Sequence, residues 1–230
     1  MIDLHSHFLP GMDDGSASAE ESAQMLRLSR QQGVSTIVAA SHFYALQDDP
    51  DAYLCRRKAA FEKIDYDPDT MPKILLGAEV TYFGGMSRSE EVRKLCIEGT
   101  KLLLIEMPLR PWTSREIEDL CELAQQGILP VMAHVERYMK RGQIPTHAEK
   151  MLREGLFFQI NADSVQTGFA GRHVLRMIKE EKVHFLGSDS HNMSRRVSKM
   201  DQAIQVIRSK LGQETLGRLD RIGAELLPVK

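Results

Sequence analysis

The chain opens with Met1-Ile2-Asp3-Leu4-His5-Ser6-His7, a short apolar segment that leads directly into two histidines. Side chains two residues apart on an extended strand share one face, so both imidazoles are predicted to point to the same side. Two histidines placed in this way can bind one metal ion. The opening therefore predicts a strand that ends in a pair of metal ligands.

Further apolar, β-branched segments follow at intervals, separated by amphipathic stretches with helix signals. Near-continuous hydrophobicity is typical of parallel strands that are covered on both faces. Ser18, with Glu21 three residues later, is a helix N-cap signal, and that helix is expected to stop at Gly33. The alternation predicts a parallel α/β fold. Its seven strands are expected at 1–4, 34–40, 74–80, 102–107, 128–133, 157–160 and 183–186, and its other helices at 52–64, 114–127, 146–155, 171–182, 200–211 and 216–227.

Length and composition limit the class of protein. With 230 residues, 42% hydrophobic content and a formal net charge of -2, the chain suits a single domain over residues 1–230, without nucleic-acid binding through bulk charge. No apolar stretch approaches the roughly 20 residues that span a bilayer, and no secretory signal is visible. Cys55, Cys96 and Cys121 form no C-x-x-C pair, so we expect a cytoplasmic protein without membrane insertion.

Side chains that typically bind metal ions follow the predicted strands at or near their ends. In parallel α/β barrels these ends converge on one mouth, so the side chains are expected to meet. Glu79 and Glu106 lie inside otherwise apolar strands, where an unpaired carboxylate would be costly. A mixed set of nitrogen and oxygen donors suits Zn, Mn or Fe. The candidate ligands are His5, His7, His42, Glu79, Glu106, His134, Asp189 and His191, together with Asp14 in the first loop, where Gly15 is expected to let the backbone turn.

Motifs for other phosphatase and hydrolase chemistries are absent from the sequence. None of the three cysteines begins a Cys-x5-Arg loop, which disfavours a cysteine nucleophile. There is also no Gly-x-Ser-x-Gly, no Gly-Lys-Ser/Thr loop and no His-Glu-x-x-His. The predicted metal ligands therefore have no competing catalytic motif among those considered.

The pattern from His5 to His191 resembles the PHP superfamily, named for polymerase and histidinol phosphatase. Within that superfamily, the opening segment, Asp13-Asp14-Gly15, Gly77-Ala78-Glu79 and His134-Val135-Glu136-Arg137-Tyr138 are similar to the bacterial capsule-type manganese-dependent tyrosine-protein phosphatases. The resemblance implies a distorted seven-stranded (β/α)7 TIM-like barrel with three divalent metal ions. Mn is the expected metal, and Fe and Zn are the alternatives. It also implies a phosphotyrosine-containing partner protein, namely the tyrosine-rich tail of a bacterial tyrosine kinase of capsule or exopolysaccharide synthesis.

Carried over by position, the resemblance assigns the nine ligands to three ions. His5, His7, Glu79 and Asp189 would bind the first ion, and Glu79 would bridge to the second, which His134 and Glu106 complete. The third would be bound by Asp14, His42 and His191. A metal-bridging hydroxide is then expected to attack phosphorus in line.

Arginines and aromatic side chains near the mouth are candidates for contacts with the substrate. Arg137, three residues after His134, is placed to bind the transferring phosphoryl group. The family pattern implies a second arginine after the last ligand, and Arg196 is preferred to Arg195. Five aromatic residues are candidates for an apolar wall or, equally, for loop packing, with Trp112 as the preferred wall residue: Phe8, Phe43, Tyr44, Tyr82 and Trp112.

Two other interpretations fit the same residues. One keeps the metal site and makes the substrate a small phosphate ester such as histidinol phosphate. The other is a metal-binding regulatory module that has lost catalysis. The nine ligands and Arg137 favour an enzyme, and Asp14 and Glu106 favour the tyrosine-phosphatase branch, because the histidinol-phosphate relatives commonly have His at both positions.

Overall fold

The computed structural model describes residues 1–139, 143–169 and 171–228. All strand pairs in the described ranges are parallel. One sheet has the order β1 (Ile2–Ser6), β2 (Thr36–Ala39), β4 (Lys73–Leu76). The other has the order β3 (His42–Phe43), β5 (Glu79–Thr81), β6 (Leu102–Glu106), β7 (Leu129–Met132), β8 (Phe157–Asn161), β9 (Phe185–Gly187). The predicted parallel α/β fold is therefore confirmed.

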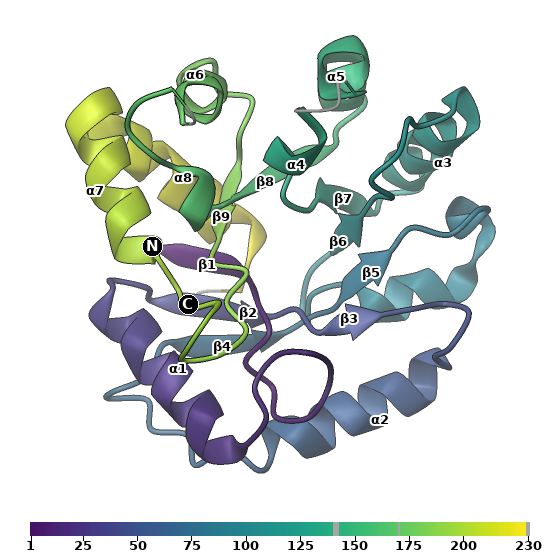
Figure 1. Ribbon diagram of the computed structural model, residues 1–230. Coiled ribbons are helices and arrows are strands. Elements are labelled where there is room, and N and C mark those ends of the chain that lie inside the picture. Colours follow the sequence, from purple (N-terminus) through teal and green to yellow (C-terminus); the bar gives the residue numbers. More distant parts are fainter. Residues whose placement is uncertain (140–142, 170, 229–230) are drawn as a thin grey trace.

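The strands curve around a centre, and the helices lie outside them (Figure 1). These helices are α1 (Ala19–Gln31), α2 (Pro50–Phe61), α3 (Ser114–Gln125), α4 (Glu136–Met139), α5 (Gln143–Arg153), α6 (Arg172–Lys179), α7 (Met200–Leu211) and α8 (Gln213–Leu226), with short 3₁₀ turns η1 (Met86–Arg88), η2 (Glu90–Leu95) and η3 (Ala162–Ser164). In the parts of the chain that the structure covers, no helix is both long and apolar enough to cross a membrane.

The strand count differs from the predicted seven because some predicted strands are interrupted. The strand predicted at 74–80 is divided into β4 and β5, and β3 follows β2 after a break of two residues. At the break between β4 and β5, the Arg57 guanidinium donates a hydrogen bond of 2.8 Å to the Gly77 carbonyl. The two sheets meet where β1 contacts the segment after β9: the Asp189 N–H donates to the His5 carbonyl at 2.7 Å and the His7 N–H to the Ser190 carbonyl at 2.9 Å.

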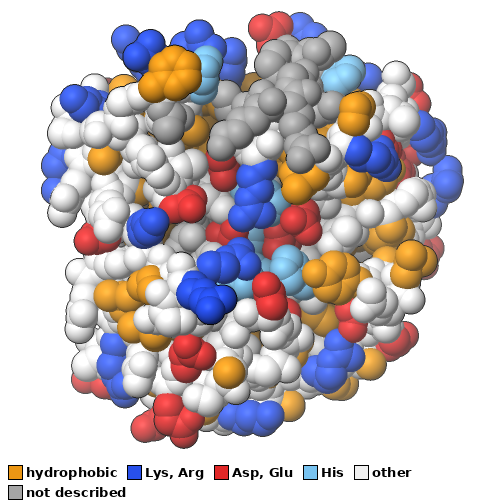
Figure 2. Space-filling view, viewed as in Figure 1, with side chains coloured by type: hydrophobic (Ala, Val, Ile, Leu, Met, Phe, Trp, Pro, Cys, Tyr) orange, Lys and Arg blue, Asp and Glu red, His pale blue; other side chains and the backbone are white. Residues whose placement is uncertain are grey.

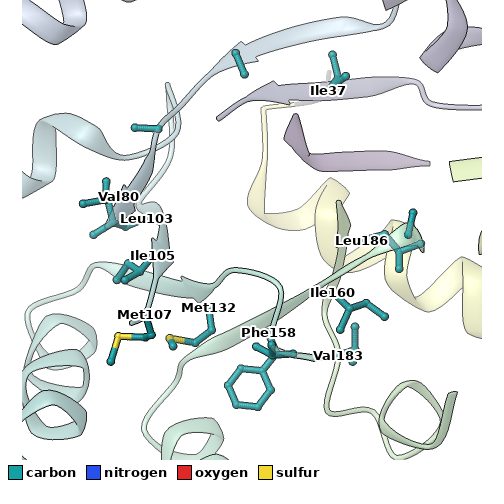
Figure 3. Close-up of a cluster of buried hydrophobic side chains, with 14 of the residues drawn as sticks. Ile37, Val80, Leu103, Ile105, Met107, Met132, Phe158, Ile160, Val183 and Leu186 are labelled. Atoms are coloured by element: carbon teal, nitrogen blue, oxygen red, sulfur yellow. The ribbon is translucent and has the colours of Figure 1, made fainter. Parts of the chain in front are cut away.

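Both faces of the strands are apolar, as the sequence predicts. Alternate residues of β6 separate into two clusters: Leu103 and Ile105 pack toward the helices, and Leu102 and Leu104 pack toward the interior. Figure 3 shows part of the helix-facing cluster, including Ile37, Val80, Leu103, Ile105, Met132, Phe158, Ile160 and Leu186. The interior cluster fills the space enclosed by the strands. The polar side chains therefore gather outside this cluster, at the carboxyl ends of the strands.

Two helix starts are informative. α1 begins after Ser18, whose hydroxyl accepts a hydrogen bond from the Glu21 N–H, as predicted. α3 is capped by Thr113, because Glu116 stands three residues later and completes a reciprocal capping box.

Candidate metal centre

The nine predicted ligands come together at the carboxyl ends of the strands. Histidines lie among acidic and basic side chains at the centre of the face shown in Figure 2. Donor atoms within 4.8 Å of one another form three overlapping groups: His7, Asp14, His42 and His191; His5, His7 and Asp189; and His42, Glu79 and Glu106. The ninth, His134, has its Nε2 2.8 Å from Glu79 Oε1 and 3.5 Å from Glu106 Oε1.

His5 and His7 are fully buried and face each other. Their Nε2 atoms are 3.0 Å apart, while the Nδ1 of His7 lies 2.7 Å from Asp13 Oδ2 and the Nδ1 of His5 lies 3.3 Å from Gln159 Oε1. If both Nδ1 atoms carry the proton that these acceptors favour, two Nε2 lone pairs converge on the same point. Such an arrangement is repulsive without a cation between the nitrogens, so the donor set fits a metal ion.

Glu79 lies at the centre of the cluster. Its Oε2 is 3.2 Å from His5 Nε2 and 3.0 Å from His42 Nδ1, and the residue is 1% exposed. Burial alone would raise the pKa of this carboxyl, but the surrounding imidazoles hold the pKa well below its usual range. Glu79 is therefore an anion in the interior, with oxygens that reach donors on both sides.

Electrostatics around His7 show how strongly the cluster attracts positive charge. Burial by itself would lower the pKa of His7, but hydrogen bonds to the Asp13 and Glu79 carboxylates raise it to about 10. Without a metal ion, a proton provides the compensating charge, and a divalent cation would compete for the same position.

Asp14, His42 and His191 form the more open side of the cluster. Asp14 Oδ1 is 3.2 Å from His191 Nε2 and 3.6 Å from His42 Nε2. The Nδ1 of His191 is 3.0 Å from the Asp189 carbonyl, and its buried Nε2 has no hydrogen-bond partner among the described residues. That nitrogen is free to bind a cation.

The neighbouring Asp13 has a supporting position. Besides contacting His7, its carboxylate accepts hydrogen bonds from the backbone N–H groups of His42, at 2.9 Å, and Gly15, at 3.0 Å. Gly15 is needed for close approach and not for a left-handed turn, because a Cβ there would lie 2.1 Å from the His7 carbonyl oxygen. The loop thus packs directly on the strand that presents His7.

Strand β8 provides two buried amides that the sequence analysis missed. Gln159 Oε1 accepts a hydrogen bond of 2.8 Å from the His134 N–H, and its Nε2 donates to Asn161 Oδ1 at 2.9 Å. Asn161 Nδ2 in turn donates to Asp189 Oδ2 at 2.7 Å. Together with the contact to His5, this chain of amides fixes three predicted ligands. The sequence contains a signal for both amides. They lie in a predicted apolar strand or directly after it, just as Glu79 lies in the apolar strand predicted at 74–80.

Two predicted ligands have an unusual backbone conformation. His134 has φ 35° and Asp189 has φ 50°, in the left-handed region that non-glycine residues rarely adopt. Such conformations cost on the order of 1–3 kcal/mol and occur mainly at functional sites, where the surrounding structure enforces them. At both positions the sharp turn directs the side chain of a strand-end residue into the cluster.

Two arginines converge on Asp189 from different loops. Arg137, on α4, donates to Asp189 Oδ2, and Arg196 donates to Asp189 Oδ1 at 2.9 Å and to Asp14 Oδ2 at 3.3 Å. Burial alone would raise the pKa of Asp189, but the charges of His5, His7 and Arg137 lower it. Arg195 and Arg196 are both exposed and both donate a backbone N–H to Asn192, but among the described residues only the Arg196 guanidinium is hydrogen-bonded to the cluster. The structure thus brings Arg196 to the cluster.

The preference for Trp112 as the aromatic wall is wrong. Trp112 is buried and packs edge-on against Tyr138, with its indole N–H donating to the Pro108 carbonyl at 3.0 Å. Tyr44 occupies the mouth instead, and its ring is stacked 5.4 Å from that of His42.

The parallel α/β fold brings the nine predicted ligands together at the carboxyl ends of its strands, the arrangement expected of a metal-binding protein. The family model described as capsular polysaccharide synthesis, CpsB/CapC, matches residues 1–226. The chain belongs to this CpsB/CapC family.

Individual relatives agree over nearly the whole chain. The tyrosine-protein phosphatase YwqE of Bacillus subtilis is 31% identical over 224 residues, which covers 93% of this chain and 86% of the relative. CpsB of Streptococcus pneumoniae, also named a tyrosine-protein phosphatase, is 28% identical and covers 92% and 91%.

Solved structures give the same result. A chain from the crystal structures of YwqE and of CpsB from S. pneumoniae, described as unique metal-dependent tyrosine phosphatases, has a TM-score of 0.86 at 27% identity and covers 100% of this chain and 95% of the other. The phosphotriesterase homology protein of Escherichia coli, at 12% identity and a TM-score of 0.55, shares the fold alone.

Proposed function

We propose that this chain is a metal-dependent protein-tyrosine phosphatase, a phosphoric monoester hydrolase. The observation that carries the proposal is the convergence of nine metal-type donors and two guanidinium groups at one end of the strands. Positive groups beside a multinuclear centre suit a phosphate dianion. Membership of the CpsB/CapC family, whose relatives include named tyrosine-protein phosphatases, supports phosphotyrosine as the substrate.

The ligand assignment that follows from the resemblance is part of this proposal. His5, His7, Glu79 and Asp189 would bind one ion, and Glu79, Glu106 and His134 a second. Asp14, His42 and His191 would bind a third, and manganese is the proposed metal. When bound, such ions acidify water so that hydroxide can attack phosphorus, and they neutralise the phosphate oxygens.

The two arginines have a separate role, which is to bind and orient the phosphoryl group. Both guanidinium groups are paired with Asp189, and their side chains are 38% and 41% exposed, so a phosphate entering the mouth can reach them. Each planar guanidinium can donate two hydrogen bonds to phosphate oxygens. Arg137 and Arg196 would thus hold the phosphate from two different loops and fix its orientation.

The finer description of the fold is also proposed. We infer a closed, distorted seven-stranded barrel that forms one domain over residues 1–230, in which β2 and β3, and likewise β4 and β5, act as interrupted strands. The hydrogen bonds between β1 and the residues after β9 support closure. The partner would be a bacterial tyrosine kinase of capsule or exopolysaccharide synthesis, and the three free cysteines support a reducing, cytoplasmic location.

The test is hydrolysis by protein loaded with Mn²⁺. We expect release of phosphate from a phosphotyrosyl peptide and little from histidinol phosphate. Near-exclusive turnover of histidinol phosphate would favour the small-molecule alternative, and no turnover of either would favour a non-catalytic metal-binding module.

Adjacent arginines provide a matched pair of variants. Arg196→Ala should reduce kcat/KM for the phosphotyrosyl peptide about 100-fold, the range for the loss of one charged donor to the transition state. Arg195→Ala should leave it within about twofold, because among the described residues only the Arg196 guanidinium is paired with Asp189 and Asp14. Equal effects of the two substitutions would remove Arg196 from the proposed site.

A further inference from the structure

An apolar groove lies beside the metal centre, at the ends of the strands that carry His42 and Glu79. It has a volume of about 640 Å³ and is lined by the segments that follow β3 and β5 and by η2. This volume is within the range of roughly 300–1,000 Å³ typical of ligand pockets. Its walls include Phe43, Tyr44, Leu46, Tyr82, Phe83 and Val92.

The groove is continuous with the metal centre. Tyr44, Gln47 and Asp48 line both the groove and a smaller cavity that contains Asp14 and His42. The Tyr44 ring, stacked on His42, forms the boundary between them. A ligand whose phosphate lies at the metal centre can therefore extend past Tyr44 into the groove.

The walls of the groove are held in place by buried polar contacts. The Asp119 carboxylate accepts hydrogen bonds from the Tyr82 hydroxyl and the Gly85 N–H, both at 2.9 Å, and from the Ser87 N–H at 3.2 Å. On the other side, the Tyr53 hydroxyl donates to the Ser41 carbonyl at 2.7 Å, directly before β3. The groove is thus preformed, which lowers the entropic cost of binding.

Exposure and charge restrict what the groove can bind. Leu46 is 99% exposed and Tyr44 is 38% exposed, so apolar surface faces the solvent here, and Figure 2 shows hydrophobic side chains bordering the histidines. The charged residues that line the groove are both acidic, Asp48 and Glu91. Asp48 is ion-paired with Arg56 and Glu91 with Lys94, so these charges are compensated and an uncharged apolar or aromatic group fits the groove.

Resting on the proposed phosphatase function, we propose that this groove binds an apolar or aromatic side chain that flanks the phosphotyrosine of the substrate peptide. Tyr44 then contacts both the phosphotyrosine and its neighbour. Selection among phosphotyrosyl sequences comes from burial of that neighbour, while the chemistry stays at the metal centre.

The test measures hydrolysis of phenyl phosphate and of phosphotyrosyl peptides by Mn²⁺-loaded protein. In the peptides, either leucine or serine is placed at each of the two residues before and the two residues after the phosphotyrosine. At one of these positions, burial of the leucine should make KM about tenfold lower than for the serine peptide, with kcat unchanged. Gly84→Trp should fill the groove, because a Cβ at Gly84 meets no atom within 4 Å. This variant should abolish the preference for leucine and leave phenyl phosphate kinetics unchanged.

Leu46→Ser removes an exposed apolar side chain from the groove and should weaken the preference for leucine. Phe169→Ser is the matched control: it removes a side chain that is 78% exposed but lies outside the groove, and it should preserve the preference. Equal KM values for leucine and serine peptides at every position, with phenyl phosphate still hydrolysed, would overturn the groove proposal and leave the phosphatase function intact. If the wild-type protein hydrolysed none of these substrates, both proposals would fail.

Discussion

Replacing Gln159 with methionine tests whether the amides of β8 orient the metal ligands. Methionine keeps the length and volume of the side chain but removes its polar atoms. In the wild-type protein, the Gln159 amide lies 2.8 Å from the His134 N, 3.3 Å from His5 Nδ1 and 2.9 Å from Asn161 Oδ1. The substitution would leave all three groups without this partner. At about 1–3 kcal/mol for each of the three unsatisfied buried groups, we expect a loss of roughly 3–9 kcal/mol in the free energy of unfolding.

The orienting role predicts a second effect that stability alone does not explain. Loss of a group that orients metal ligands typically weakens metal binding about 10–100-fold. Titration calorimetry of metal-free protein with Mn²⁺ measures this affinity, and urea denaturation of the same sample measures stability. Gln125→Met is the control for the chemical change, because Gln125 is exposed and lies away from the cluster, with its Nε2 3.4 Å from Glu154 Oε2. A Gln159→Met protein that binds Mn²⁺ with wild-type affinity would refute the orienting role, whatever its stability.

Three further predictions concern single residues. Asp189→Ala should abolish phosphatase turnover while circular dichroism remains that of the folded protein, and an active variant would overturn the proposed site. Gly187→Ala should destabilise the protein by about 1–3 kcal/mol in thermal denaturation, because its Cβ would lie 2.6 Å from His5 Cβ; an unchanged melting temperature would contradict this close approach. Burial, together with the charge of Arg218, lowers the pKa of His184 to about 4. The unfolded chain therefore binds a proton first, near pH 6.5, and we expect stability to fall by on the order of 2 kcal/mol as the pH drops from 6.5 to 4. His184→Asn, which keeps an acceptor for the Phe158 N–H, should show a smaller fall in urea denaturation, and an equal fall would exclude His184 as the cause.

The ligand positions were predictable because parallel topology alone brings strand ends together. His5 and His191 are far apart in sequence, yet each follows a recognisable apolar segment, and no further information was needed to expect them at one mouth. The amides of β8 satisfy the same criterion as Glu79, a polar group in or directly after an apolar strand. They were overlooked because Gln and Asn are rarely metal ligands, although they are well suited to orient them.

Other features depend on tertiary packing that no local pattern reveals. The break between β4 and β5 occurs inside the predicted strand at 74–80, where Arg57 from α2 contacts the Gly77 carbonyl. Trp112 and Tyr44 both follow predicted strands closely, and only the packing of Trp112 against Tyr138 decides which ring is left at the mouth. The cap at Thr113, in contrast, was readable from Glu116 three residues later.

The contact between β1 and the residues after β9 has a consequence for biosynthesis. The Ser6 and Ser190 hydroxyls are hydrogen-bonded at 2.9 Å across a sequence separation of 184 residues, and ligands lie on both sides of this junction. A nascent chain cannot offer Asp189 and His191 until residues 189–191 have emerged from the ribosome. The predicted set of nine donors can therefore assemble only after residue 191 has been made, so a product truncated before Asp189 would lack two of the nine.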